Sequence, residues 1–186
     1  MQTKRVGGFS LIEVLVAVLV LAIGALGAAR AQVAALQTRH NTALMSSAVQ
    51  LAGSLADRMR ANASEVQGGD AFNPYLLLAY DALADGAPVP PERLCFGGAE
   101  CNGAQMAAFD MYEMTEALHA GFPGARVVVC RDAAVVAEGR GVLAWDCAGG
   151  AGAPIVIKLG WRTKGDKPED EASFAPAVAV VARGAS

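Results

Sequence analysis

The chain has 186 residues, a net charge of −3, 54% hydrophobic residues and only 18% charged ones. This length allows about one domain of ordinary size, which excludes most multidomain enzymes. The composition is too apolar for a disordered chain. No stretch interleaves basic with aromatic residues, so nucleic acid is not an expected main partner. Much of the apolar content lies between Phe9 and Ala29, where Glu13 is the single charge and Ser10 the only other polar side chain.

Three interpretations of this apolar segment compete. A secretory signal peptide would explain the basic start at Lys4 and Arg5, but small residues follow the apolar core without an evident end to the helix. A plain membrane anchor explains the length, because 21 residues of helix can cross about 30 Å of hydrocarbon. It leaves Glu13 unexplained, since a carboxylate at the bilayer centre costs roughly 2.5–3.5 kcal/mol. Either Glu13 lies at the membrane interface, near the favourable helix N-terminus, or it has a partner.

The residues around Glu13 form a more specific pattern. Residues 7–13 read GGFSLIE, after a short basic leader and before the apolar helix. This arrangement resembles the class III signal of type IV prepilins and type II secretion pseudopilins. The resemblance implies cleavage by a prepilin peptidase after Gly8 and N-methylation of the new terminal residue, Phe9. It also implies that the Glu13 carboxylate pairs with the free amine of a neighbouring subunit during assembly.

The resemblance and the basic residues together predict a membrane topology. The basic residues Lys4 and Arg5 place a leader of residues 1–8 in the cytoplasm by the positive-inside rule. Residues 9–29 then form a single transmembrane and assembly helix in the inner membrane, and the rest of the chain is periplasmic. Removing the leader takes away two positive charges and changes the net charge to −5.

The segment after the anchor predicts a continuation of the same helix. No proline occurs before Pro74, and residues 30–62 are mostly good helix formers. A helix over 9–61 would span about 80 Å. Gly24 and Gly27 are weak points in it, which either allow close helix packing or let the helix loosen as it leaves the bilayer. The apolar residues of the amphipathic part recur at helical spacing: Val33, Leu36, Leu44, Ala48, Leu51, Leu55 and Met59.

The end of this helix carries a second resemblance. Residues 55–62 read LADRMRAN and are similar to the end of the long helix in PilV-type minor pilins. The order of helix, cysteine-containing middle and a PIVIKLGW strand at 154–161 resembles the same group. Arg58 and Arg60 either form a solvated face or meet acidic groups on an adjacent subunit.

The remaining residues, 63–186, are expected to form a periplasmic globular head. Gly- and Pro-rich residues 68–103 predict a loop with at most a short helix near 75–83, and residues 104–120 predict a second helix. Alternating apolar residues predict an antiparallel sheet with one face on the long helix. The expected fold class is therefore α+β and pilin-like. The strands are expected at 125–131, 154–161 and 177–183, with a weaker one at 141–146.

Four cysteines follow the apolar segment, and sequence alone allows three pairings. Neither sequential pair has a CxxC spacing, and both histidines, His40 and His119, lie far from the cysteines, which disfavours zinc. Disulfides suit a periplasmic head because that compartment is oxidising. Loops of modest length favour one pairing: Cys95 with Cys101 and Cys130 with Cys147.

Other chemistry is not expected. The acidic residues Asp166, Glu169, Asp170 and Glu171 offer oxygen ligands for calcium, but their spacing does not match an EF-hand and Pro168 interrupts it. A solvated hairpin loop over 164–171 is the better interpretation. No common nucleophile, zinc-protease or phosphate-loop motif occurs. We therefore expect no enzyme activity, no cofactor and no metal.

Together these observations predict a PilV-type minor pilin in the initiation or tip complex of a type IV pilus. The resemblance implies roles in pilus assembly, twitching motility and attachment, and a final location on the pilus at the cell surface. The expected partners are other minor pilins, the major pilin, prepilin peptidase and the inner-membrane assembly platform. A minor pseudopilin of the type II secretion system, GspI type, is the alternative. A DNA-uptake pilin is disfavoured by the net charge of −5 after processing.

Overall fold

The computed structural model describes residues 10–97, 99–136, 141–150, 152–163 and 174–183. It contains two units, Met1–Ala43 and Leu44–Ser186. The helix α1, Leu11–Ala61, has 51 residues and passes through the boundary between the units. The long helix predicted from the sequence is therefore confirmed over its described length, and Phe9 lies outside the described residues.

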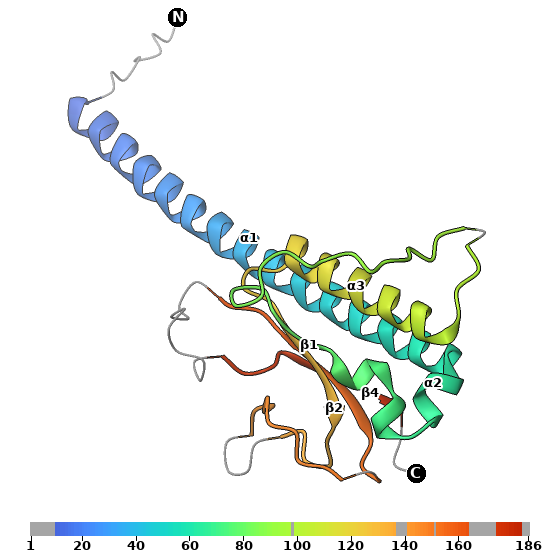
Figure 1. Ribbon diagram of the computed structural model, residues 1–186. Helices are drawn as coiled ribbons and strands as arrows, with labels where there is room; N and C mark the ends of the chain where they lie inside the picture. Colours follow the sequence, from blue (N-terminus) through green and yellow to red (C-terminus); the bar gives the residue numbers. More distant parts are fainter. Residues whose placement is uncertain (1–9, 98, 137–140, 151, 164–173, 184–186) are drawn as a thin grey trace, which may run out of the picture. The chain divides into compact units, whose positions relative to one another are not determined.

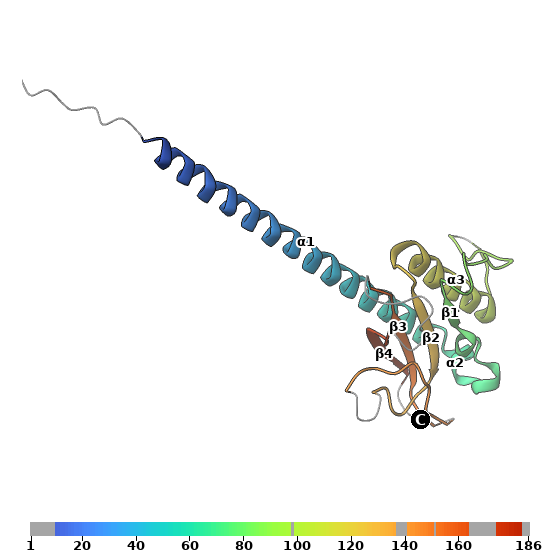
Figure 2. The same ribbon diagram turned by 90° about the vertical axis from the view of Figure 1, so that its left-hand side faces the viewer.

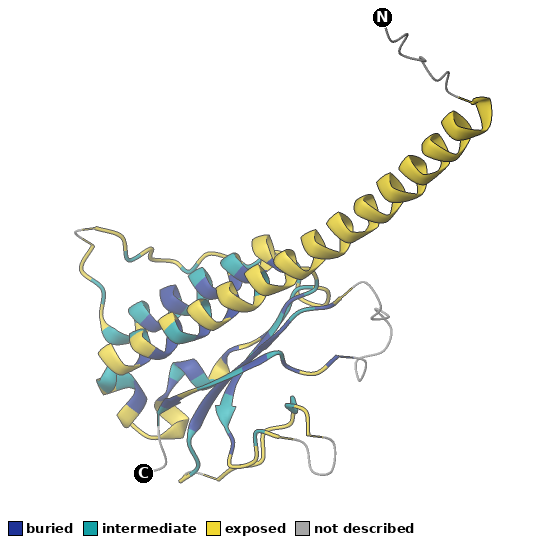
Figure 3. Cartoon of the chain, turned by 180° about the vertical axis from the view of Figure 1, so that it is seen from behind, coloured by how far each residue is buried: buried dark blue, intermediate teal, exposed yellow. Residues whose placement is uncertain are grey.

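In the first unit, every described residue from Ser10 to Ala43 is exposed (Figure 3). Large apolar side chains, such as Leu11 and Leu21, are among them. One 18-residue window has a mean hydropathy of 2.7, so this helix is long and apolar enough to cross a membrane. A helix that is apolar on all sides is stable only when lipid or other protein covers it.

In the second unit, α1 is apolar on one stripe. Its buried residues are Ala48, Ala52, Leu55, Ala56 and Met59, which recur at three and four residues. The three alanines are completely buried. Helix α3, Gly103–Gly121, runs beside α1 in the opposite direction (Figure 1) and begins at a capping box of Asn102 and Gln105.

The sheet has four antiparallel strands in the order β1-β2-β3-β4: Ala79–Asp81, Arg126–Arg131, Ile155–Gly160 and Val178–Arg183. Figure 2 shows β2, β3 and β4 side by side. The hydrophobic core contains Val127 and Val129 of β2 together with Ile155, Ile157 and Leu159 of β3, and it includes the buried stripe of α1. The α+β fold and the three principal strands predicted from the sequence are confirmed.

The segment between α1 and α3 differs from the prediction. The structure has a short helix α2 at Ala63–Gln67, and 3-10 turns η1 at Asp70–Phe72 and η2 at Pro74–Leu77. The sequence predicted a loop with at most a short helix near 75–83; the 3-10 turn η2 covers the start of this range, but residues 79–81 form the unpredicted strand β1 and pair with β2. Pro74 is the first residue of η2. The Asn73 side chain caps this turn by accepting a hydrogen bond from the Tyr75 amide at 3.1 Å. A three-residue strand is too short to give a periodic signal.

The weak strand predicted at 141–146 is wrong. Leu143 forms an isolated bridge with Val136, and the described residues 141–150 otherwise form a loop. This loop, with residues 132–136, is named here the outer segment. It crosses the face of the sheet that α1 does not cover: an added Cβ on Gly160 would lie 3.0 Å from a ring carbon of Trp145. All six residues of β3 are consequently buried.

An ion pair is buried under the outer segment. The Lys158 ammonium lies 2.6 Å from a carboxylate oxygen of Asp132, and both side chains are 0% exposed. Lys158 also donates hydrogen bonds to the carbonyl oxygens of Ala144, at 2.7 Å, and Asp146. The amides of Ala134 and Ala148 donate to Asp132. The ion pair and these hydrogen bonds therefore replace most of the hydrogen bonds to water that the two charged groups lose on folding.

These contacts change the acidity of Asp132. Burial acts to raise the pKa of this carboxyl, but the hydrogen bond from Lys158 and the amides of Ala134 and Ala148 outweigh burial. The pKa of Asp132 is therefore lower than its ordinary value in the folded protein. A lowered folded-state pKa contributes stability above the unfolded-state pKa, and that contribution is lost as pH falls through the folded-state value.

We predict that Asp132→Asn lowers the free energy of unfolding by about 3–5 kcal/mol, because it leaves the Lys158 charge buried without a counterion. Urea unfolding of the detergent-solubilised chain, followed by tryptophan fluorescence, measures this. The wild type should lose stability below about pH 4, and the variant should lack that part of the pH dependence.

Asp57→Asn is the matched control, since Asp57 is 77% exposed and pairs with Arg60 at the surface. It should change stability by less than about 1 kcal/mol. The double variant Asp132→Leu with Lys158→Met should recover most of the lost stability. Equal effects of Asp132→Asn and Asp57→Asn would show that the buried pair has no special role.

Candidate assembly site

The first described turn of α1 contains Glu13. The carbonyl oxygen of Ser10 accepts the first hydrogen bonds of the helix, from the amides of Glu13 at 3.0 Å and Val14 at 3.3 Å. Glu13 is exposed and lies where the positive end of the helix dipole favours a carboxylate. Among the described residues it forms no ion pair, and its immediate neighbours Ile12 and Leu15 are exposed apolar residues. Gly8 and Phe9 lie outside the described residues.

The two glycines in the apolar helix do not interrupt it. α1 continues through Gly24 and Gly27, and a Cβ added at either position would meet no atom within 4 Å. In the isolated chain, therefore, neither glycine is required by a contact. Both interpretations made from the sequence, close packing against another helix and local loosening, stay predictions about the assembled state.

The end of α1 is joined to α3 by a polar cluster. Arg58 donates hydrogen bonds to Asp110, at 2.9 Å, and to Glu113. The Tyr75 hydroxyl donates to the second oxygen of Asp110 at 2.7 Å, and Asn62 donates to the Tyr75 oxygen at 3.2 Å. Asp110 is almost completely buried, so these donors supply the bonds that water cannot. The cluster connects the long helix, η2 and α3.

The cluster shows that Arg58 is not simply a solvated residue, while its contact with another subunit stays a prediction. Helix α3 runs antiparallel to α1 and brings both carboxylates, Asp110 and Glu113, to Arg58 within the same chain. The environment also affects Tyr75. Burial raises the pKa of its hydroxyl, helped by Asp110 and opposed by the hydrogen bond from Asn62. Tyr75 therefore stays neutral and serves as a hydrogen-bond donor.

Arg60 has a different set of partners. Its guanidinium pairs with Asp57 and donates to the carbonyl oxygens of Ala182 at 3.1 Å and Val181 at 3.2 Å. Those carbonyls belong to β4, the last strand of the sheet. Arg60 thus connects the last turn of α1 to the edge of the sheet and is only partly a solvated residue.

The second unit contains two disulfide bonds, Cys95–Cys101 and Cys130–Cys147, with Cα separations of 6.0 and 6.1 Å. This is the pairing favoured by loop length. The first bond closes the loop before α3, where the ring of Phe96 meets that of Phe109 edge-on at 4.7 Å. The second joins β2 to the outer segment. Each such bond typically stabilises a fold by about 2–4 kcal/mol.

Within the described ranges, no group of three or more His, Cys, Asp or Glu side chains is arranged to hold a metal ion. The acidic loop that the sequence analysis weighed for calcium, residues 164–171, lies outside the described residues. The polar clusters around Arg58 and Lys158 are hydrogen-bonded supports of the fold. The chemistry that the described residues offer is association through an apolar helix with one carboxylate.

Comparison with known proteins agrees with this picture. Residues 3–29 match the family model of the prokaryotic N-terminal methylation motif, and residues 31–112 match that of type IV pilin Tt1218. No curated protein and no solved structure matches the chain. Each match covers less than half of the chain, and together they show that it is similar to type IV pilins and contains an N-terminal methylation motif.

These two similarities have direct implications. The prepilin motif implies processing by a peptidase and assembly with other pilins, and the apolar helix fits a membrane-anchored pilin. The pilin family is structural and not enzymatic. The assembly residues implied by the resemblance are all in the first unit, whereas the polar contacts of Arg58, Arg60 and Lys158 belong to the second.

Proposed function

We propose that this chain is a PilV-type minor pilin, incorporated at low copy into a type IV pilus within the initiation or tip complex. It would support pilus assembly, twitching motility and attachment. The observation that carries the proposal is the exposed apolar helix with a single carboxylate, Glu13, in its first turn. Such a helix needs a cover of lipid before assembly and of other helices afterwards.

Processing and assembly follow from this arrangement. Cleavage after Gly8 would create a free amine on Phe9, and methylation would leave that amine able to carry a positive charge. Glu13 lies four residues further on, about 6 Å along a helix. In an apolar bundle, a carboxylate without a counterion is costly, so pairing with the amine of a neighbouring subunit would favour assembly in one register.

The proposed organisation has a leader at 1–8, an assembly helix at 9–29, its amphipathic continuation at 30–62 and a periplasmic head at 63–186. Two disulfide bonds support a location in an oxidising compartment. The proposed partners are other minor pilins, the major pilin, prepilin peptidase and the inner-membrane assembly platform. The head would supply partner specificity.

A second candidate, a GspI-type minor pseudopilin of the type II secretion system, is supported by the same signal at residues 7–13. Deletion of the gene separates the two functions. A minor pilin predicts loss of surface pili and twitching with normal exoprotein secretion. A pseudopilin predicts loss of secretion with normal pili. Electron microscopy, a twitching assay and the protein content of the culture medium measure these outcomes.

Processing gives a further prediction. The mature protein extracted from membranes should lack residues 1–8 and carry one methyl group on Phe9, because the prepilin peptidase acts on this signal. Intact-mass measurement, followed by sequencing of the N-terminal peptide, checks both changes. A full-length mass in cells that process their other pilins would contradict the proposed function.

Glu13→Ala should leave processing largely intact but reduce co-purification with the other minor pilins by at least about tenfold, equivalent to 1.4 kcal/mol. The physical reason is that the neighbouring amine would lose its counterion in an apolar surrounding. Glu116→Ala, which removes an exposed carboxylate from α3, is the control and should co-purify normally. Normal co-purification of Glu13→Ala would count against the pairing role.

A further inference from the structure

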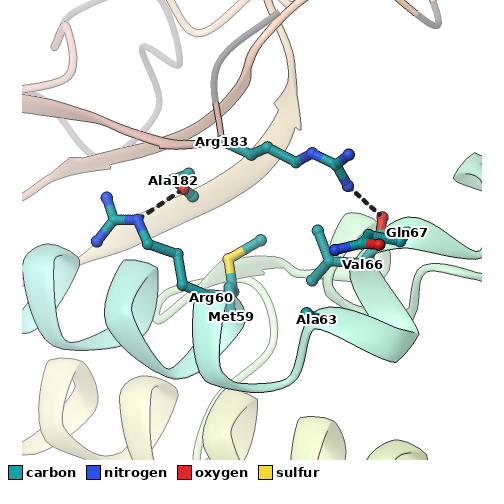
Figure 4. Close-up of a pocket in the computed structure, with 7 residues that line it drawn as sticks. All are labelled: Met59, Arg60, Ala63, Val66, Gln67, Ala182 and Arg183. Atoms are coloured by element: carbon teal, nitrogen blue, oxygen red, sulfur yellow. Dashed lines mark hydrogen bonds between the residues drawn. The ribbon is translucent and has the colours of Figure 1, made fainter. Parts of the chain in front are cut away.

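The ends of α1, α2 and β4 line an open pocket of about 200 Å³ within the second unit (Figure 4). Its apolar part is formed by Met59, Ala63, Val66 and Ala182, three of which are buried. Its polar part is formed by Arg60, Gln67 and Arg183. Figure 4 shows the two arginines on opposite sides of Met59. This open pocket is named here the arginine-rimmed pocket.

The rim carries positive charge that the described residues only partly neutralise. Asp57 pairs with Arg60 from outside the lining, and the lining itself contains no carboxylate. Arg183 donates to the carbonyl oxygen of Val66 at 3.3 Å and forms no ion pair with any residue in the described part of the chain. A guanidinium has five N–H donors, so both arginines keep donors for another acceptor. This local excess of positive charge contrasts with the chain's net charge of −3.

The size of the pocket favours a side chain as its occupant. Sites for small molecules usually have volumes of about 300–1,000 Å³, and this one is smaller. Pockets that accept one anchoring side chain from a partner are typical of the centre of protein interfaces. β4 lies at the edge of the sheet, and its residue Val181 is 48% exposed beside the pocket residue Ala182. An extended segment of another protein can therefore approach along this strand.

We propose that the arginine-rimmed pocket docks an acidic segment of a partner subunit. An apolar side chain of the partner enters between Met59 and Val66, and an adjacent Asp or Glu carboxylate accepts hydrogen bonds from Arg60 and Arg183. Arginine suits this task because its planar group can hold a carboxylate with two parallel bonds. The inference rests on the proposed pilin function, which supplies the other subunits, and it adds the chemistry that the head recognises in them.

The test uses the full-length chain in membranes, co-expressed with the other minor pilins. Gln67 is replaced by p-benzoylphenylalanine, and the adduct formed on illumination is sequenced by mass spectrometry. We expect a peptide from another subunit with an Asp or Glu beside an apolar residue. Arg183→Gln, alone or with Arg60→Gln, should lower the adduct yield at least about tenfold. Substitution of the partner's acidic residue by its amide should have the same effect.

Arg93→Gln is the matched control, because Arg93 is exposed and, among the described residues, donates a single hydrogen bond of 3.5 Å to the carbonyl oxygen of Glu100. It should leave the adduct unchanged. Arg183→Gln alone keeps the test valid if Arg60→Gln lowers stability, and an unchanged urea midpoint shows that Arg183→Gln is folded. An adduct with phospholipid, an adduct only with a second copy, no protein adduct, or a yield insensitive to Arg183→Gln would each overturn the proposal.

The two proposals can fail separately. If the wild-type chain does not co-purify with minor pilins, the proposed function itself fails. If it co-purifies and Glu13→Ala abolishes that association, but Gln67 yields no adduct with an acidic segment, only the docking proposal fails.

Discussion

The need to cover one continuous helix in two different ways governs this molecule. Apart from Glu13, residues 11–29 of α1 are apolar on every side, and no described residue of the chain buries them. The part in the second unit is apolar on one stripe, which the core buries. The first kind of surface requires lipid or other helices, whereas the second is satisfied by the chain's own sheet. Folding and association are thus assigned to different residues of one helix.

The polar clusters of the second unit have a common physical basis. Arg58 with Asp110, and Lys158 with Asp132, each place at least one charged group beyond the reach of water. Each buried carboxylate accepts additional hydrogen bonds, from Tyr75 in one case and from backbone amides in the other. Such clusters add little net stability compared with apolar packing, but removal of one member leaves a costly charge behind. They therefore penalise any arrangement in which the elements that they join are displaced.

Most of the architecture was predictable because its signals are long or strongly periodic. The long helix, α3 and the strands at β2, β3 and β4 each contain several residues of one period. The missed elements are short: β1 has three residues and follows a 3-10 turn set by Asn73 and Pro74.

The contacts were harder to predict than the elements. The alternation in β3 predicts one face on the long helix but carries no sign of a partner for Lys158 on the other face, where the outer segment places Asp132 beside it. Arg58 binds Asp110, which lies 52 positions away in the chain, and Arg183 binds the carbonyl oxygen of Val66, which lies 117 positions away. Sequence periodicity carries no information about such distant partners.

The alanines in the buried stripe of α1 have a consequence for how this sequence can diverge. Ala48, Ala52 and Ala56 are all 0% exposed and lie where the helix meets the core. A larger side chain at any of them must displace neighbouring atoms, which typically costs about 1–3 kcal/mol. The apolar residues from Leu11 to Leu26 are exposed, have no such neighbours among the described residues and need only remain hydrophobic. Substitutions should therefore accumulate unevenly along a single helix, limited by side-chain volume near its end and by hydropathy near its beginning.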